Sequence, residues 1–194
     1  TALQDESVAD WKIFLRWKLI LATSPYLSSD LEEEHFDFYG KKLNGKQEME
    51  PRWKRVIDAE NNAIGEAIGR VYVDRYFDPS SKVRMEEMVS NLKKAFRERI
   101  QNLVWMEPET KKKALIKLEA LDVQVGYPDE WLNYSELEVR NDSYVMNILR
   151  GSKFKFHHGP TGLDKIGKPV DRKLWEMNPQ ETNAYAEYNK VIVV

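Results

Sequence analysis

Apolar side chains recur at helical spacing through most of the first 121 residues of the chain. In residues 10–22, Trp11, Leu15 and Leu19 return every four residues with basic side chains between them, which is typical of an amphipathic helix. Similar patterns, most with a proline or serine near their start, predict helices over residues 10–22, 28–43, 51–77, 80–103 and 108–121. We therefore expect this part of the chain to be mainly α-helical.

Two glycines, Gly65 and Gly69, lie four residues apart in the repeat AIGEAIG. At this spacing they share one face of the predicted helix and allow another element to approach closely. The helix is too polar for a membrane, so we expect a neighbouring helix to pack against this face.

The hydrophobic period changes after residue 121. Residues 122–127 read DVQVGY, and this alternation predicts a short strand or extended segment that ends at Gly126 and Pro128. A further helix is predicted over residues 143–156. Residues 159–169 contain three glycines and two prolines, which is typical of a connector between structural units.

The C-terminal residues predict a β-hairpin. Residues 183–186 and 190–194 flank the short stretch EYN, which suits a tight turn between two strands. The second of these strands ends in VIVV, which is apolar on both faces and typical of a strand inside a covered sheet. A lone hairpin is marginal in water, so we expect the partner strands to lie outside this sequence.

Charge and composition exclude several classes of protein. Thirty Lys and Arg against 32 Asp and Glu leave a formal charge of −2, which argues against binding to nucleic acid or to an anionic membrane. The absence of Cys excludes disulfides and Cys-ligated metal sites. No apolar run reaches the roughly 20 residues of a membrane helix. The first residue is Thr rather than Met, which indicates a cut end.

Few residues form a recognisable catalytic pattern. The three histidines, His35, His157 and His158, lie in no HExxH-like spacing, and the adjacent pair diverges by about 100° on a helix. No GxSxG motif marks a serine nucleophile. Asn183 lies within a predicted strand, where its carboxamide is able to hold the backbone of an extended peptide, although an Asn at the end of a loop is the alternative.

Four blocks, taken in order, resemble the neprilysin and endothelin-converting-enzyme family of zinc metalloendopeptidases, including its bacterial endopeptidase-O-like members. The blocks are PRWKRVIDAENNAIGEAIGRVYVDRYF (51–77), RIQNLVWMEPETKKKALIKLEAL (99–121), GYPDEW (126–131) and KPVDRKLWEMNPQETNAYAEYNKVIVV (168–194). The resemblance covers nearly the whole chain and matches the middle of a much longer ectodomain.

The resemblance implies a fold and a domain organisation. Residues 1–158 would form part of a mostly helical lid domain, residues 159–167 a connector, and residues 168–194 the first β-hairpin of a thermolysin-like catalytic domain. The family's HExxH helix, its further zinc ligand and its transition-state-stabilising His would follow Val194. On this view the segment holds no catalytic residue and no metal ligand, and zinc belongs to the full-length enzyme.

The resemblance also implies a substrate-binding strand. The family's NAY or NAF motif matches Asn183, Ala184 and Tyr185, so Asn183 would bind the substrate backbone through its side chain and Ala184 through its main chain. The match weakens immediately afterwards, because the family usually has a second aromatic residue and a longer turn with proline. Here Ala186 and the shorter EYN follow.

The function implied is that of a segment of a zinc metalloendopeptidase that hydrolyses small peptides. The segment would supply the lid and the strand, would be inactive alone, and would have the C-terminal catalytic half of the same protein as its partner. The alternative is a non-catalytic helical module, derived from the lid domain, that binds peptides or acts as a scaffold. Because vertebrate members are rich in disulfides, the lack of Cys favours a bacterial source. The resemblance implies an extracellular or periplasmic location, since most members of the family lie outside the cytoplasm, with a cytoplasmic location left open.

Overall fold

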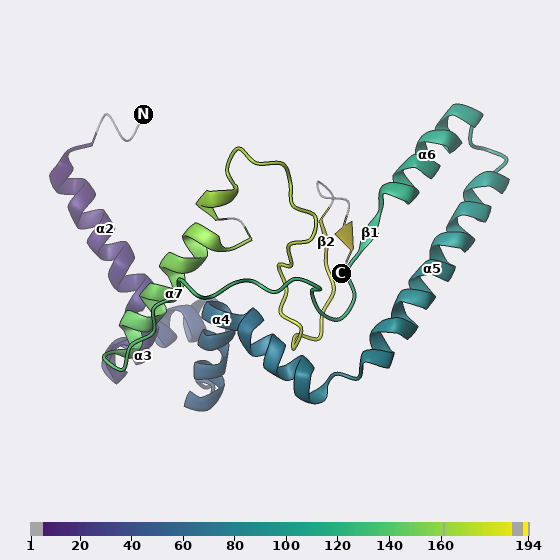
Figure 1. Cartoon of the computed structure of the whole chain (residues 1–194). Coiled ribbons are helices and arrows are strands. Elements are labelled where there is room, and N and C mark those ends of the chain that lie inside the picture. Colours follow the sequence, from purple (N-terminus) through teal and green to yellow (C-terminus); the bar gives the residue numbers. More distant parts are fainter. Residues whose placement is uncertain (1–5, 161, 188–191, 194) are drawn as a thin grey trace. The chain divides into compact units, whose positions relative to one another are not determined.

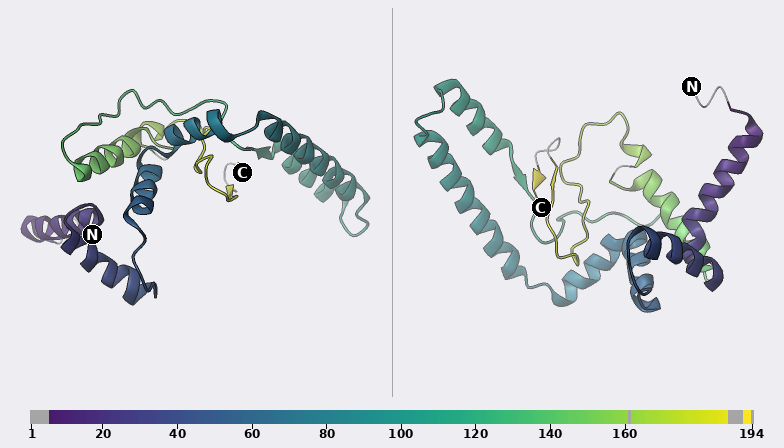
Figure 2. Two further views of the ribbon diagram at one scale, coloured as in Figure 1. Left: turned by 90° about the horizontal axis from the view of Figure 1, so that it is seen from below. Right: turned by 180° about the vertical axis from the view of Figure 1, so that it is seen from behind.

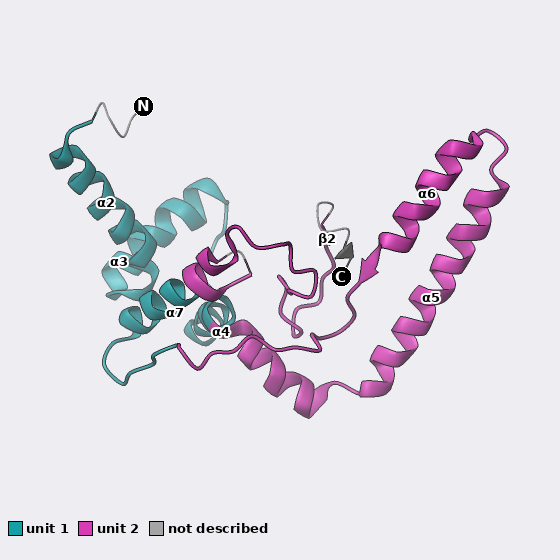
Figure 3. Cartoon of the chain, turned by 45° about the horizontal axis from the view of Figure 1, so that its top comes forward, with its two compact units in different colours: residues 1–63, 137–154 teal, residues 64–136, 155–194 magenta. Residues whose placement is uncertain are grey.

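The computed structural model describes residues 6–160, 162–187 and 192–193 (Figure 1). These residues divide into two compact units, which are considered separately (Figure 3). The first unit contains residues up to 63 together with residues 137–154, and the second contains residues 64–136 and those from 155 onward. The helices α4 (Arg52–Tyr76) and α7 (Tyr144–His158) each contribute to both units.

The described part of the first unit consists of helices and the loops that join them. Its elements are α2 (Val8–Thr23), η1 (Ser24–Tyr26), α3 (Ser29–His35), the π-helix η2 (Phe36–Leu43), and the parts of α4 and α7 that belong to it. Ser7 caps α2, because its hydroxyl oxygen accepts a hydrogen bond from the Asp10 N–H at 3.2 Å.

Close contact between α4 and α7 forms the small core of the first unit. Ala59 on α4 and Phe154 on α7 are only 4% and 5% exposed. A side-chain carbon added at Gly151 would lie 3.0 Å from the Cβ of Ala63, so the missing side chain of Gly151 allows the two helices to approach.

The second unit contains a helical hairpin formed by α5 (Pro79–Asn102) and α6 (Pro108–Ala120), which lie side by side (Figures 1 and 2). Each helix begins with a proline, as predicted for α6, whereas α5 starts at Pro79, one residue before the Ser80 expected from the sequence. Asp78 caps α5 by accepting the Ser80 N–H at 2.9 Å. Lys93 on α5 donates to the carbonyl of Leu121 at 2.8 Å, which ties the end of α6 to its neighbour.

A small three-stranded sheet completes the second unit. Its strands are β1 (Asp122–Val123), β2 (Ala186–Glu187) and β3 (Ile192–Val193), in the order β1-β3-β2. Strand β3 is parallel to β1 and antiparallel to β2. Both neighbours of β3 therefore come from this chain, and the expectation that its partner strands lie outside the sequence is wrong.

The predicted helices are all present, with boundaries close to those expected. The antiparallel pairing of the C-terminal hairpin is also confirmed, but its ladder begins at Ala186 rather than at Asn183. Of the predicted turn EYN, only Glu187 belongs to the described residues. Val191 and Val194 of the VIVV stretch also lie outside the described residues. Two features were not expected: η2 winds as a π-helix, and Ile64 has a non-helical backbone (φ −135°, ψ 30°) within α4.

Candidate functional site

The two residues predicted to bind substrate, Asn183 and Ala184, lie in an extended segment just before β2. Both are exposed. The side-chain oxygen of Asn183 accepts a hydrogen bond from the Ala184 N–H at 2.8 Å. This bond engages one acceptor of Asn183 and the N–H of Ala184, while the Asn183 Nδ2 and the Ala184 carbonyl are not part of it.

Strand β2, which follows these residues, lies at one edge of the described sheet. Within the described part of the chain it pairs with β3 alone. The backbone groups on the opposite side of an edge strand are suited to pair with an extended peptide.

A folded loop supports this segment from its N-terminal side. Asn178 and Glu181 close a turn, because the Glu181 N–H donates to the Asn178 carbonyl at 3.0 Å and the Asn178 amide donates to the Glu181 carboxylate at 2.5 Å. The Tyr185 hydroxyl accepts the Glu176 N–H at 3.3 Å. These bonds fix the chain on both sides of Asn183.

The loop rests on α4 at the two glycines that the sequence marks. Gly65 and Gly69 are buried, and a side-chain carbon at Gly65 would overlap the carboxamide of Asn178. A side-chain carbon at Gly69 would lie 2.6 Å from the Cδ of Pro179. The close approach is confirmed, but the expectation of a neighbouring helix is wrong, because a loop occupies this face. Glycines create room without specifying which element fills it.

Glu66, between the two glycines, holds a second loop. Its carboxylate accepts the N–H of Leu132, and the Tyr134 hydroxyl is hydrogen-bonded to the backbone of Glu66 and Ala67. Burial raises the pKa of the Glu66 carboxyl, and the bond from Leu132 opposes that rise. One turn of α4 therefore organises two loops, and no motif in the sequence marks Glu66 for this role.

Residues of the GYPDEW and KPVDR blocks contact each other or nearby backbone. Arg172 donates to the carbonyl of Ala120 at 2.6 Å, at the C-terminal end of α6, where carbonyls lack helical partners. The side-chain amide of Gln124 donates to the carbonyl of Arg172 at 3.0 Å. Lys82 donates to the carbonyl of Tyr127 at 3.0 Å and lies 4.3 Å from the centre of its ring. The contacts of these blocks hold the strand region in place.

The histidines lie apart from the substrate-binding segment in sequence. His35 lies on α3, where burial lowers its pKa. His158 has Glu136 3.3 Å from Nε2 and Asp164 3.2 Å from Nδ1, so the two carboxylates approach opposite sides of the ring rather than a common point. In the part of the chain that the structure describes, no group of three or more His, Asp or Glu side chains is arranged to hold a metal ion.

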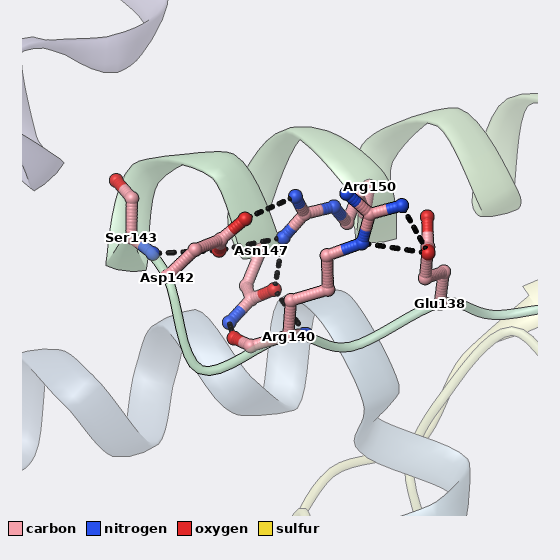
Figure 4. A network of polar contacts seen from close by, with 6 residues as sticks. All are labelled: Glu138, Arg140, Asp142, Ser143, Asn147 and Arg150. Carbon is pink, nitrogen blue, oxygen red and sulfur yellow. Dashed lines mark hydrogen bonds and ion pairs between the residues drawn. The ribbon is translucent and has the colours of Figure 1, made fainter.

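A separate polar network surrounds the start of α7 (Figure 4). Arg150 donates two hydrogen bonds to the carboxylate of Asp142, at 2.9 and 2.6 Å, in the bidentate geometry that arginine favours. Asp142 also accepts the Ser143 N–H at 2.6 Å. Asn147 lies between Arg150 and Arg140, accepting a bond from the side chain of the first and donating to the carbonyl of the second. The network fastens the preceding loop to the first turns of α7.

Acidification should weaken this network. The Arg150 guanidinium and the Ser143 N–H hold the pKa of the Asp142 carboxyl well below its usual range. A carboxyl whose pKa is lowered by folding stabilises the folded state at pH values above its ordinary pKa, which is about 4 for aspartate. This stabilisation is lost as the pH falls from about 4 toward the lowered pKa. We expect Asp142→Asn to reduce hydrogen-exchange protection in residues 144–150 at pH 7. The difference in protection between wild type and variant should become smaller as the pH falls from about 5 to about 2, because Asp142 then becomes protonated in the wild type.

The control is Asp37→Asn, which removes a half-exposed ion pair with Lys41. Such surface pairs contribute little, so protection should change much less. A deficit in Asp142→Asn that is equally large at pH 2 and pH 7 would contradict the assignment.

None of the described helices combines the length and apolar character needed to cross a bilayer.

The model of peptidase family M13 matches residues 1–128. The chain is 32% identical over 179 residues to an endothelin-converting enzyme homolog of Locusta migratoria, covering 89% of this chain and 24% of that protein. It is 29% identical over 187 residues to mouse neprilysin, covering 92% of this chain and 24% of that protein. The chain thus spans about a quarter of these relatives' length.

Solved structures agree with this assignment. Zinc metalloprotease Zmp1 of Mycobacterium tuberculosis, in complex with an inhibitor, matches with a TM-score of 0.84 and 40% identity over 96% of this chain and 28% of that one. PepO of Lactobacillus rhamnosis matches with a TM-score of 0.77 and 28% identity over 89% of this chain and 27% of that one. The family match over two thirds of the sequence, together with these likenesses, shows that the chain belongs to peptidase family M13.

Proposed function

We propose that this chain is a segment of a bacterial zinc metalloendopeptidase and contributes its helical lid domain and the strand that binds the substrate backbone. The observation that carries the proposal is the position of Asn183 and Ala184, exposed and immediately before an edge strand. Residues 1–158 belong to the lid domain, residues 159–167 connect it, and residues 168–194 begin the catalytic domain.

The substrate is an extended small peptide that lies along β2. The Asn183 carboxamide offers both a donor and an acceptor, and the main chain of Ala184 offers the backbone groups with which a peptide pairs. The Asn183 Oδ1 and the Ala184 N–H are paired with each other. The Asn183 Nδ2 and the Ala184 carbonyl offer a donor and an acceptor to the substrate backbone without loss of that bond.

Zinc belongs to the full-length enzyme and not to this segment. The histidines and carboxylates of the described residues do not fit a catalytic zinc site, because they form no cluster that converges on one point. We therefore assign the zinc ligands, and the residues that act on the scissile bond, to sequence beyond Val194. On this proposal the segment alone does not hydrolyse peptides.

The partner of this segment is the catalytic half of the same protein. Along α5, apolar side chains are about half exposed or more, among them Val83, Leu92 and Phe96. Apolar stripes of this kind are typical of surfaces that another part of the protein covers. A chain that spans about a quarter of its relatives' length leaves ample sequence to cover them.

We assign the enzyme to the extracellular or periplasmic space of a bacterium, with the cytoplasm as the alternative.

The test is Asn183→Ala in the full-length enzyme. Loss of a hydrogen bond to substrate should lower kcat/KM for short peptides by about 1–3 kcal/mol in transition-state terms, or roughly five- to 150-fold. The control is Thr182→Ala, which truncates the neighbouring exposed side chain and should leave turnover within about two-fold of wild type. Unchanged kcat/KM in Asn183→Ala would contradict the role of the strand, whereas a full-length protein that hydrolyses no peptide would favour the non-catalytic module.

A further inference from the structure

Gln180 links helix α4 to the segment that carries Asn183. Its side-chain amide donates a hydrogen bond to the carbonyl oxygen of Gly65 at 3.1 Å. A helical carbonyl keeps a second lone pair after bonding within its helix, and no side chain at Gly65 blocks the approach to it. A glutamine from outside the helix is therefore able to reach it.

The proline before Gln180 adds a steric contact to this bond. Pro179 lies against Gly69, one helical turn after Gly65, at a distance that leaves no room for a side chain on the glycine. Pro179 and Gln180 are both partly buried. The loop is thus fixed to α4 at two points, one by packing and one by a hydrogen bond.

Only two residues separate Gln180 from Asn183. An extended chain spans at most about 3.6 Å per residue, so Asn183 lies within about 11 Å of Gln180. The turn bond from Glu181 to Asn178 and the bond between Glu176 and Tyr185 flank this stretch, so a shift at Gln180 is not readily absorbed before Asn183. We propose that Gln180 is a positioning residue: its bond to Gly65 sets where Asn183 and Ala184 meet the peptide backbone. This inference rests on the substrate-binding role proposed above, and it adds a residue that does not itself touch substrate.

The bond to the Gly65 carbonyl requires a hydrogen-bond donor at residue 180, so the test variant replaces the amide of Gln180 with a group that cannot donate. Gln180→Glu keeps the size of the side chain but directs a carboxylate oxygen at the Gly65 carbonyl, so two acceptors face each other. We expect the full-length enzyme to lose five- to twenty-fold in kcat/KM for a short fluorogenic peptide, mainly through a higher KM. The strand holds the peptide in both the ground state and the transition state, so kcat should change less than two-fold.

The matched control is Gln47→Glu. Gln47 donates its side-chain amide to the carbonyl of Gly45, also at 3.1 Å, on an exposed loop of the first unit. The same chemical change at the same kind of bond should leave both kinetic constants unaltered. A second variant, Gly69→Ala, would place its methyl group 2.6 Å from the Cδ of Pro179 and 2.8 Å from the Oε1 of Gln180. It therefore displaces the anchored loop while Gln180 keeps its amide, and it should reproduce the KM-selective loss.

A double-mutant cycle with Asn183→Ala separates positioning from a merely structural role. If Gln180 acts through the strand, Gln180→Glu should lower kcat/KM by a clearly smaller factor when Asn183 is already alanine, because only the main-chain contact of Ala184 then remains to be displaced. Full additivity of the two changes, or an unchanged KM in both Gln180→Glu and Gly69→Ala, would overturn the positioning role. Failure of Asn183→Ala alone to impair turnover would instead overturn the substrate-binding role, so the two failures are distinguishable.

Discussion

Replacing Trp175 by alanine is expected to lower the free energy of unfolding of the chain by about 3–5 kcal/mol. The indole is only 9% exposed and is one of the few large apolar groups buried in the described part of the chain. It borders two small cavities, one that includes Gln124 and one that includes Glu66. Truncation removes the apolar contacts of the ring and leaves a void that the surrounding loops fill only in part. Urea unfolding followed by circular dichroism measures the loss.

Trp105→Ala provides the comparison within the same unit. This tryptophan is 74% exposed, so its removal should change the free energy of unfolding by no more than about 0.5 kcal/mol. Equal losses in the two variants would mean that Trp175 is not the centre of the local core.

Alanine at Gly126 is expected to lower the free energy of unfolding by about 2–5 kcal/mol. Gly126 has a φ of +73°, and a left-handed backbone costs about 1–2 kcal/mol for other residues. In addition, the new methyl group would lie 2.8 Å from the Cζ of Phe77, and such overpacking costs about 1–3 kcal/mol. The same unfolding measurement applies.

Gly167→Ala separates the two contributions. Gly167 has nearly the same backbone, with a φ of +76°, but no atom outside its immediate chain neighbours lies within 4 Å of the added carbon. Only the backbone term of about 1–2 kcal/mol should appear there. The difference between the two variants measures the contact with Phe77, and a difference near zero would show that Phe77 yields without cost.

The helices were predictable because their signals are local. Amphipathic spacing, the proline at the start of α6 and the serine near the start of α5 are all read within a few residues of each boundary. The π-helical winding of η2 and the non-helical backbone of Ile64 were missed, because neither has a comparable local signal.

The arrangement of the sheet and of the glycine face was less predictable. The apolar stretch around Ile192 indicates a covered strand, but its sequence does not reveal that it pairs with Asp122 and Val123. Gly65 and Gly69 likewise predict a close contact without identifying the loop that makes it. In both cases the missing information lies far away in the sequence.

The candidate site came from a resemblance rather than from spacing. Asn183 and Ala184 are marked by the NAY motif, and their exposure before an edge strand agrees with the role proposed for them. Gln180 and Arg172 carried no such signal. Their partners are the carbonyl groups of Gly65 and Ala120, and every residue has a carbonyl, so residue identity does not reveal the pairing.

The central position of β3 has a consequence for biosynthesis. The contacts of α5 and α6 are local, so this hairpin is able to form soon after Ala120 leaves the ribosome. Strand β1 follows at once but pairs with β3, which is synthesised only after α7 and the loops beyond it. Until Ile192 emerges, the nascent chain carries a strand with an open edge, and the sheet closes last through the insertion of its middle member.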